Sequence, residues 1–291
     1  MMYYAPKTHD EITGLLEKLI DEKTILLAGG TDAIAKRNSR SERSGWITPD
    51  NVGCSQEEHM IYLGNLELDY ISQEGNEIRI GACTTLSDVL YSPIIEKNAS
   101  ALKSAISEIA GISIRNIATI GGNIMNASPA ADTVPVLMVY DAKLILTGAD
   151  GDRVVGITDF FTGPGETVCK KGEYLKEVRF PICTGNSKFL KYGRRKAETL
   201  SVVNGAAYAI IEDGKFKDIR LAVGAVAPIP LRLKKIEDML KGKVVSDELL
   251  ETVLKKTDEM IAPIDDKRST ASYRGSLTKV LIKRLLREVC K

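Results

Sequence analysis

The sequence contains few of the side chains that most often carry out chemistry. Its 291 residues include two histidines, His9 and His59, and five widely spaced cysteines without a Cys-x-x-Cys pair. This composition argues against a Ser-His-Asp triad, a histidine-rich metal centre, a disulfide framework, a structural zinc site or an iron–sulfur cluster within the chain. If the protein takes part in redox chemistry or group transfer, a bound cofactor must therefore supply the reactive group.

An excess of one charge and a long apolar run are also missing. Lysine and arginine number 40 against 39 acidic residues, so no basic surplus indicates a nucleic acid or an acidic membrane as partner. No apolar run approaches the ~18 residues of a membrane span, and the first residues lack the apolar segment of a signal peptide. We therefore expect a cytoplasmic globular protein of about two domains that binds neither nucleic acid nor membrane.

A turn rich in glycine and small polar residues lies at 118–132. Gly121 and Gly122 permit positive φ and close backbone approach. Thr119, Asn123 and Ser128 place short donors and acceptors on the same segment. Such a turn can surround a pyrophosphate with backbone N–H groups, but an ordinary tight turn before a helix explains the same residues.

A second turn of this kind is Gly29-Gly30-Thr31-Asp32, which follows the short apolar strand expected at 24–28. It is another candidate phosphate loop, with a plain turn as the alternative. The pattern G-x-G-x-x-G occurs nowhere in the chain, so a Rossmann dinucleotide-binding fold has no support.

The remaining pattern predicts an α+β chain with many antiparallel strand pairs. Residues 34–58 are expected to form an exposed loop, and 183–187 to separate two domains. Helices are predicted over 8–21, 86–92, 101–110, 230–240, 246–261 and 270–290, and strands over 24–28, 66–71, 77–82, 143–147, 153–155, 174–181, 188–193, 202–212 and 216–226.

The densest positive charge is the run Lys188 to Lys196. It either faces a phosphate or the pyrimidine edge of a flavin, or forms a solvated strand edge on which lysines prevent aggregation. Likewise, 159–165 either borders a cofactor or forms a surface turn.

Taken together, the two glycine turns resemble those of the FAD-binding medium subunits of the molybdenum hydroxylases. This family includes the flavoprotein subunits of xanthine, nicotinate and carbon monoxide dehydrogenases. The matching motifs are Ala28-Gly-Gly-Thr-Asp32, Arg115-Asn-x-Ala-Thr-Ile-Gly-Gly-Asn123, Ala127-Ser-Pro-Ala-Ala-Asp132, Ile80-Gly-Ala-Cys-Thr-Thr85, Asp159-Phe-Phe-Thr-Gly-Pro-Gly165, Ala225-Val-Ala-Pro228 and Ser272-Tyr-Arg274.

The resemblance implies a two-lobed FAD-binding fold of the vanillyl-alcohol oxidase type over residues 1–180. Its lobes would span about 1–57 and 58–180, followed by a C-terminal domain of antiparallel sheet plus helices at 185–291. The segment around Cys54 matches the family poorly.

The resemblance also implies the cofactor-binding residues. The pyrophosphate group would lie on Leu26, Leu27, Ala28, Gly29, Gly30, Thr31, Asp32 and Ala33. The phosphates and the ribityl chain would be held by the segment starting at Ala118, through Thr119, Gly122, Asn123, Asn126 and Ser128. Asp132 would accept from a hydroxyl, Ile109 and Ala110 would border the adenine end, Leu175 and Lys191 would lie near the flavin, and Leu200 would cover one ring face.

The implied function is electron transfer. A separate molybdopterin subunit would hydroxylate a purine or another N-heterocycle, and a 2Fe–2S subunit would pass the electrons to this FAD, with NAD⁺ as the suitable acceptor. FAD would be dissociable, since neither histidine lies in a glycine turn, and no residue here would be catalytic or bind a metal. The alternatives are a stand-alone FAD-dependent oxidoreductase of the same wider fold and a non-catalytic nucleotide-binding or assembly protein.

Overall fold

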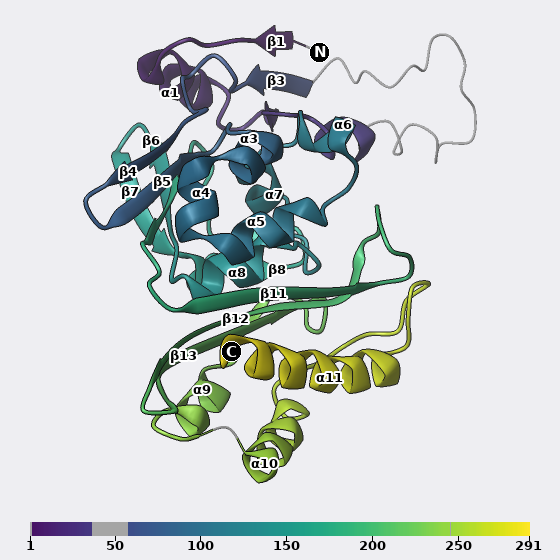
Figure 1. The fold of residues 1–291 in the computed structure, drawn as a ribbon. Helices are drawn as coiled ribbons and strands as arrows, with labels where there is room; N and C mark the ends of the chain where they lie inside the picture. The colour runs from purple at the N-terminus through teal and green to yellow at the C-terminus, as the bar shows by residue number, and fades with distance from the viewer. Residues whose placement is uncertain (1, 37–57, 245) are drawn as a thin grey trace.

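The computed structural model describes residues 2–36, 58–244 and 246–291. The N-terminal part of the chain forms two lobes, and a C-terminal domain lies against the second of them (Figure 1). No helix in the described part of the chain is both long and apolar enough to cross a membrane.

The first lobe is a small parallel sheet covered by one helix. Strands β1 (Met2–Tyr4), β3 (Glu58–Tyr62) and β2 (Lys23–Leu27) lie in that order, and β3 pairs in parallel with both neighbours. Helix α1 (His9–Lys18) is capped at its N-terminus by Thr8, whose hydroxyl accepts from the N–H of Glu11. Because β3 is the central strand of this sheet, the first lobe extends beyond the boundary expected at about residue 57.

The second lobe combines an antiparallel sheet with a group of short helices. The sheet has the order β4 (Ile71–Glu74), β5 (Glu77–Gly81), β10 (Tyr174–Pro181), β6 (Lys143–Gly148), β7 (Gly151–Gly156). The helices are α3 (Leu86–Tyr91), α4 (Pro93–Asn98), α5 (Ser100–Ser107), α6 (Ile112–Arg115), α7 (Ile120–Met125) and α8 (Thr133–Val139). A 3₁₀ turn at Ile157–Asp159 and the short pair β8 (Phe161–Gly163) and β9 (Glu166–Thr167) complete the lobe.

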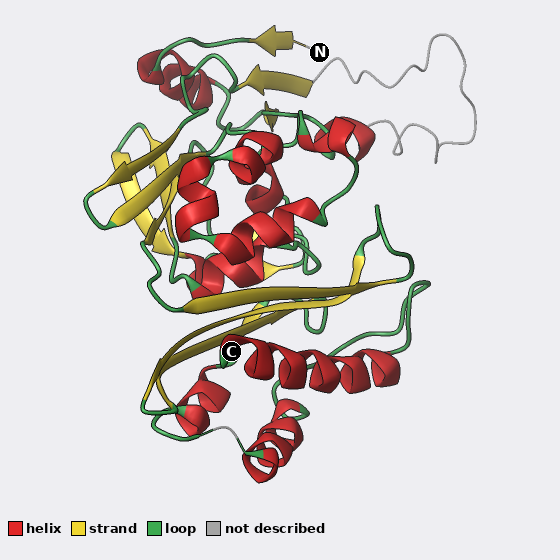
Figure 2. Ribbon diagram, in the orientation of Figure 1, coloured by secondary structure: helices red, strands yellow, loops and turns green. Residues whose placement is uncertain are grey.

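The C-terminal domain is an antiparallel meander backed by helices. Its sheet has the order β11 (Asn186–Gly193), β12 (Ser201–Glu212), β13 (Lys215–Gly224), β14 (Leu231–Arg232). Helices α9 (Lys234–Leu240), α10 (Asp247–Thr257) and α11 (Ala271–Val289) lie on one side of this sheet, and the helices of the second lobe lie on the other (Figure 2). The predicted α+β class and the predicted meander are confirmed.

One apolar core runs from the second lobe into the C-terminal sheet. It joins Leu102 of α5 and Val136 of α8 to Phe189 of β11 and Ala206 of β12, all of which are almost completely buried. The two domains therefore share a packed interface, and a site at their junction has a rigid frame.

Several predicted elements differ from the structure, and the helices expected over 8–21 and 246–261 end early, at Lys18 and Thr257. The strand expected at 66–71 begins only at Ile71, because Leu66 and Leu68 pack into the first-lobe core from an irregular segment. The helix expected over 230–240 begins at Lys234, since Leu231–Arg232 pairs with β13 instead. The helix at 101–110 ends at Ser107. The loop expected at 34–58 lies almost entirely outside the described residues, as does Cys54.

Candidate cofactor-binding site

The two glycine turns, almost ninety residues apart in the chain, lie in direct backbone contact. A Cβ atom added to Gly29 would lie 1.9 Å from the carbonyl oxygen of Ile117 and 3.1 Å from the Cα of Ala118. Only glycine permits this approach. Lys36, which follows the first turn, also donates to Asn126 Oδ1 at the end of α7. The fold therefore joins the two turns into one site.

The first turn offers unused donors. The N–H groups of Gly29, Gly30, Thr31 and Asp32 donate to no acceptor within the described part of the chain. Gly30 has φ +70°, so consecutive N–H groups lie in the type of turn that forms an anion-binding concavity. A ligand with several charged oxygens would satisfy these donors.

The second turn uses its donors internally. At the start of α7, Ile120 N–H donates to Thr84 O, Gly121 N–H to Ala82 O, and Gly122 N–H to the hydroxyl of Thr119, each at 3.0 Å. Its glycines serve close packing, because a Cβ on Gly121 would lie 2.5 Å from Ala82 O. The backbone at the start of α7 is therefore a wall of the site rather than a set of free N–H donors.

One cavity adjoins these turns on the side of the N-terminal sheets, and we call it the apolar cavity. Its volume is about 240 Å³. Its lining is Leu26, Ala28, Leu63, Ala82, Cys83, Gly121, Gly122, Met125, Tyr174 and Leu175. Burial, followed by the charge of Asp69, raises the pKa of the Cys83 thiol to about 12. Thiolate chemistry is thereby suppressed in this cavity.

A second cavity lies at the domain junction and is lined by other residues of α7, and we call it the polar cavity. Its volume is about 220 Å³. Its lining is Ile109, Ala110, Asn123, Asn126, Ser128, Ala130, Ala131, Asp132, Lys191, Glu198, Thr199 and Leu200. The Leu200 residue is 62% exposed, so the rim presents an apolar side chain with little to cover it.

A buried ion pair forms the floor of the polar cavity. Lys191 Nζ lies 2.6 Å from Asp132 Oδ2 and donates to Glu108 O at 2.9 Å, with the two charged side chains only 3% and 7% exposed. Ser201 Oγ and Asn204 Nδ2 donate to Asp132 Oδ1 at 2.5 and 2.6 Å. Both oxygens of the Asp132 carboxylate thus accept hydrogen bonds, as a buried charge requires.

Unused polar groups remain in this cavity. An ammonium carries three donors, so Lys191 keeps one beyond the two acceptors named above. The Asn123 amide oxygen accepts from the Thr133 hydroxyl at 2.6 Å, and the Asn126 amide oxygen accepts from Lys36, which leaves both amide NH₂ groups without an acceptor in the described residues. Ser128 Oγ accepts from Ala130 N–H at 3.3 Å and can still donate. The cavity thus offers donors to an oxygen-rich ligand.

The backbone beside the polar cavity is strained and braced. Ala110 has φ +44°, an unfavourable value for a residue with a side chain. Arg115 donates from one guanidinium nitrogen to the carbonyls of Ile109 and Ala110, at 2.8 and 2.7 Å. Arg115 therefore maintains the wall that these two residues form. In the neighbouring cavity, burial raises the pKa of Glu108 despite the nearby Lys191 ammonium.

The structure changes the predicted grouping within the site. Ile109 and Ala110, expected at the adenine end, lie in the same cavity as Lys191 and Leu200. Leu175, expected with Lys191 near the flavin, lines the apolar cavity instead. The predicted groups and the cavity linings therefore differ, because chain order does not reveal which residues share a cavity.

Two residues of the site, Ser201 and Asn204, were missed from the sequence. Both are fully buried at the start of β12. The sequence does contain a signal for Asn204, which is a polar side chain inside the apolar run from Val202 to Ile211. The basic run is divided: Lys191 is buried at the polar cavity, whereas Arg194, Arg195 and Lys196 line an adjoining cavity of about 370 Å³.

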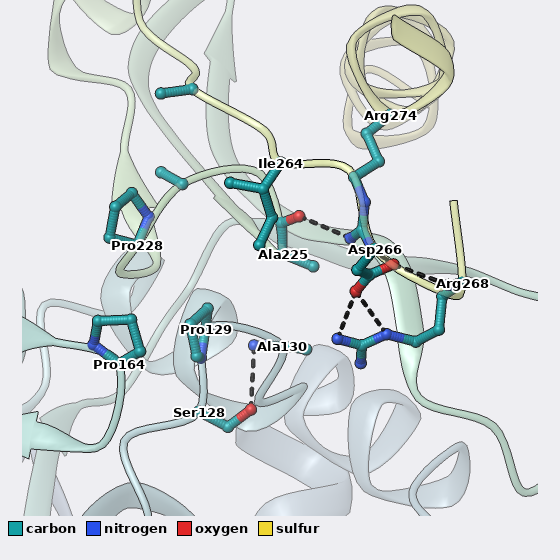
Figure 3. Close-up of a pocket in the computed structure, with 12 residues that line it drawn as sticks. Ser128, Pro129, Ala130, Pro164, Ala225, Pro228, Ile264, Asp266, Arg268 and Arg274 are labelled. Carbon is teal, nitrogen blue, oxygen red and sulfur yellow. Dashed lines mark hydrogen bonds and ion pairs between the residues drawn. The ribbon is translucent and has the colours of Figure 1, made fainter. Parts of the chain in front are cut away.

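A further cavity, of about 340 Å³ (Figure 3), shares Ser128 and Ala130 with the polar cavity. Pro129, Pro164 and Pro228 form apolar walls, and Asp266 bridges Arg268 and Arg274 at one end. Although burial opposes it, hydrogen bonds from the backbone and side chain of Arg268 and from Arg274 lower the pKa of Asp266. Arg274 also donates to the carbonyl oxygens of Val202 and Ala225, so this cluster secures the β12 and β13 ends.

Two family models together match almost the whole chain. The model described as the FAD binding domain in molybdopterin dehydrogenase matches residues 1–183, and the model described as the CO dehydrogenase flavoprotein C-terminal domain matches residues 188–289.

Individual relatives agree with these models. The chain is 32% identical to a putative xanthine dehydrogenase FAD-binding subunit of Escherichia coli K12 over 90% of this chain and 87% of that protein. It is 31% identical to the nicotinate dehydrogenase FAD-subunit of Eubacterium barkeri over 99% of this chain and 95% of that protein. Among solved structures, a carbon monoxide dehydrogenase from Hydrogenophaga pseudoflava matches with a TM-score of 0.90 and 28% identity, covering 99% of this chain and 96% of the other.

Proposed function

We propose a function from one premise: the chain belongs to the family of FAD-binding flavoprotein subunits of the molybdenum hydroxylases. It is accordingly the flavoprotein component of an oxidoreductase, and its own task would be electron transfer. In the proposed scheme, electrons released at a molybdopterin subunit reach this chain through a 2Fe–2S subunit and leave to NAD⁺.

The observation that carries the proposal is the junction of the two glycine turns. Four N–H groups at 29–32 have no acceptor in the described residues, and this turn contacts the segment that lines both an apolar cavity and a polar one. A ligand with a pyrophosphate between a flat base and a ring edged with carbonyl and N–H groups fits this arrangement, because a buried pyrophosphate needs several convergent donors. FAD has this composition.

We assign the adenine end to the apolar cavity and the flavin end to the polar cavity. Leu26, Met125 and Leu175 would contact a flat, weakly polar ring. The donors of Asn123, Asn126 and Ser128 would hold the ribityl hydroxyls, and Asp132 and Lys191 would face the polar edge of the flavin. The exposed Leu200 would cover a ring face.

When bound, FAD supplies a group that accepts electrons singly and releases them as a hydride. The residues of this chain would bind and orient it, and the Lys191 ammonium would favour negative charge on the reduced ring. The scarcity of histidine fits a chain that performs no acid–base catalysis.

The acceptor and the partners are argued from other observations. Arg194, Arg195 and Lys196 line a cavity next to the polar cavity, which suits an anionic dinucleotide such as NAD⁺. The relatives are named as subunits or medium chains, which favours a complex over the alternative of a stand-alone FAD oxidoreductase. Size-exclusion chromatography of the native protein separates the two, since partner subunits co-elute only in the first case.

The test of the site is the variant Gly122→Asp. A Cβ there would meet only Thr119 Oγ1, at 3.0 Å, so the chain should fold while a carboxylate enters the cofactor site. We expect FAD stoichiometry, measured from visible absorbance, to fall well below one. The matched control is Gly14→Asp on α1, where a Cβ would have no neighbour within 4 Å. Wild-type stoichiometry in Gly122→Asp would refute the assigned site, and a wild-type chain that never takes up FAD would refute the function.

A further inference from the structure

Two fully buried residues of β12, Ser201 and Asn204, donate to the carboxylate that anchors Lys191. We infer that they are positioning residues, which fix Asp132 so that it holds the Lys191 ammonium at the polar cavity and thereby set how strongly this chain favours reduced over oxidised FAD. The inference rests on the proposed function, because it requires the flavin end of FAD in the polar cavity.

The amide of Asn204 can take only one orientation. Its Nδ2 atom faces three acceptors: Asp132 Oδ1 at 2.6 Å, Ala131 O at 3.4 Å and Ala130 O at 3.5 Å. The reversed amide would place an oxygen against all three. The side chain is therefore a dedicated donor to the segment that carries Asp132.

This arrangement leaves a polar atom unsatisfied. Asn204 Oδ1 is buried and has no hydrogen-bond partner in the described part of the chain. A buried acceptor without a donor destabilises the fold, so packing alone would favour an apolar side chain at this position. The amide of Asn204 therefore serves Asp132 through its donors and not the packing of the sheet.

The neighbouring strand is adapted to this amide. Gly224 pairs with Asn204 across the sheet, and a Cβ on Gly224 would lie 2.2 Å from Asn204 Oδ1. Glycine at 224 therefore provides the space in which the amide keeps its orientation.

The two donors and Lys191 bind different oxygen atoms of the Asp132 carboxylate. Ser201 and Asn204 occupy Oδ1, which leaves Oδ2 to Lys191. Without them the carboxylate is free to rotate and its negative charge is less dispersed. A less compensated negative charge beside the flavin disfavours the electrons that the flavin accepts. Reduced FAD should then lose more affinity than oxidised FAD.

The experiment compares FAD-loaded wild-type protein with the double variant Ser201→Ala/Asn204→Leu. The dissociation constant of oxidised FAD is measured by fluorescence titration and the two-electron midpoint potential by equilibration with reference dyes. We expect the preference for reduced over oxidised FAD to fall about tenfold, which is a midpoint about 30 mV more negative. Gly224→Ala, which displaces the amide without removing a donor, should shift the potential in the same direction.

The matched controls lie on β11. Ser187→Ala removes a hydroxyl bonded to Tyr140, and Asn186→Leu removes an amide bonded to Val289 O. Neither should change the potential. Equal weakening of both redox forms in the double variant would indicate a merely structural role and overturn the inference.

Two further outcomes are decisive. If the double variant binds no FAD, the single variant Ser201→Ala, which removes only one donor, is measured instead. A smaller shift of the midpoint to negative potential supports the inference, and an unchanged midpoint overturns it. A wild-type chain that does not bind FAD refutes the proposed function itself, whereas normal binding with unshifted variants refutes only this inference.

Discussion

The two cavities beside α7 have similar volumes, about 240 and 220 Å³, but different origins. The apolar cavity is built only by residues up to Leu175, and aliphatic side chains dominate its lining. The polar cavity needs both domains, because Lys191 to Leu200 close it from the C-terminal side. One end of the site is thus complete within the N-terminal domain, and the other exists only when the C-terminal sheet is docked.

With FAD placed as proposed, the difference between the cavities indicates which end of the site would control the redox properties of the cofactor. An apolar cavity with close backbone contacts supplies affinity for a flat ring through burial. The polar cavity holds a buried ion pair with matched donors, and such charges act on the redox properties of a bound group. Three predictions sharpen this comparison, in order of decreasing effect.

The largest effect is expected where the two turns meet, since both cavities depend on that contact. Gly29→Ala places a methyl group 1.9 Å from Ile117 O and must force the turns apart. We expect stoichiometric FAD binding to be lost, measured by visible absorbance after reconstitution and gel filtration. Gly14→Ala on α1 is the control; it should retain FAD and raise the free energy of unfolding by up to about 1 kcal/mol. Full FAD content in Gly29→Ala would show that the contact does not support the site.

A smaller effect is expected from the ion pair of the polar cavity. Lys191→Met leaves the Asp132 carboxylate buried without its cation and should lower the free energy of unfolding of the FAD-free chain by about 3 kcal/mol, measured by urea denaturation. Lys176→Met is the matched control: its pair with Asp152, at 2.9 Å, is well exposed and should contribute less than about 1 kcal/mol. Equal losses in the two variants would contradict the comparison. The double change Asp132→Leu/Lys191→Met should recover part of the loss, because it removes both charges.

The smallest effect concerns the thiol of the apolar cavity. Because burial raises the pKa of Cys83 to about 12, almost none of it is thiolate at pH 8. Mass spectrometry after brief iodoacetamide treatment should show Cys290, which is exposed, modified before Cys83. The Cys83 rate should rise about tenfold per pH unit between 8 and 11, as thiolate forms. Bound FAD should slow it further, and alkylation of Cys83 as fast as Cys290 at pH 8 would refute the apolar environment.

Much of the fold follows from local pattern. The meander of β11 to β13 and the helices α10 and α11 agree with the prediction, because period-two and period-3.6 apolar spacing reports directly which face is buried. The predictions were wrong where tertiary packing overrides this apolar spacing. Leu66 and Leu68 alternate like a strand, yet they fill the first-lobe core from an irregular segment.

The sequence by itself determined the family and the two glycine turns, and it predicted many of the residues that line the two cavities. A short motif can identify the family because close backbone contact restricts certain positions to glycine. These glycines are visible in the sequence even when the segment that they contact is unknown. Only the tertiary structure decided that Gly29 abuts Ile117, that α7 lines two cavities, and that Ser201 and Asn204 complete the carboxylate cluster. These facts depend on contacts between residues about seventy to ninety positions apart, which the packing of the two domains creates and which no local pattern encodes.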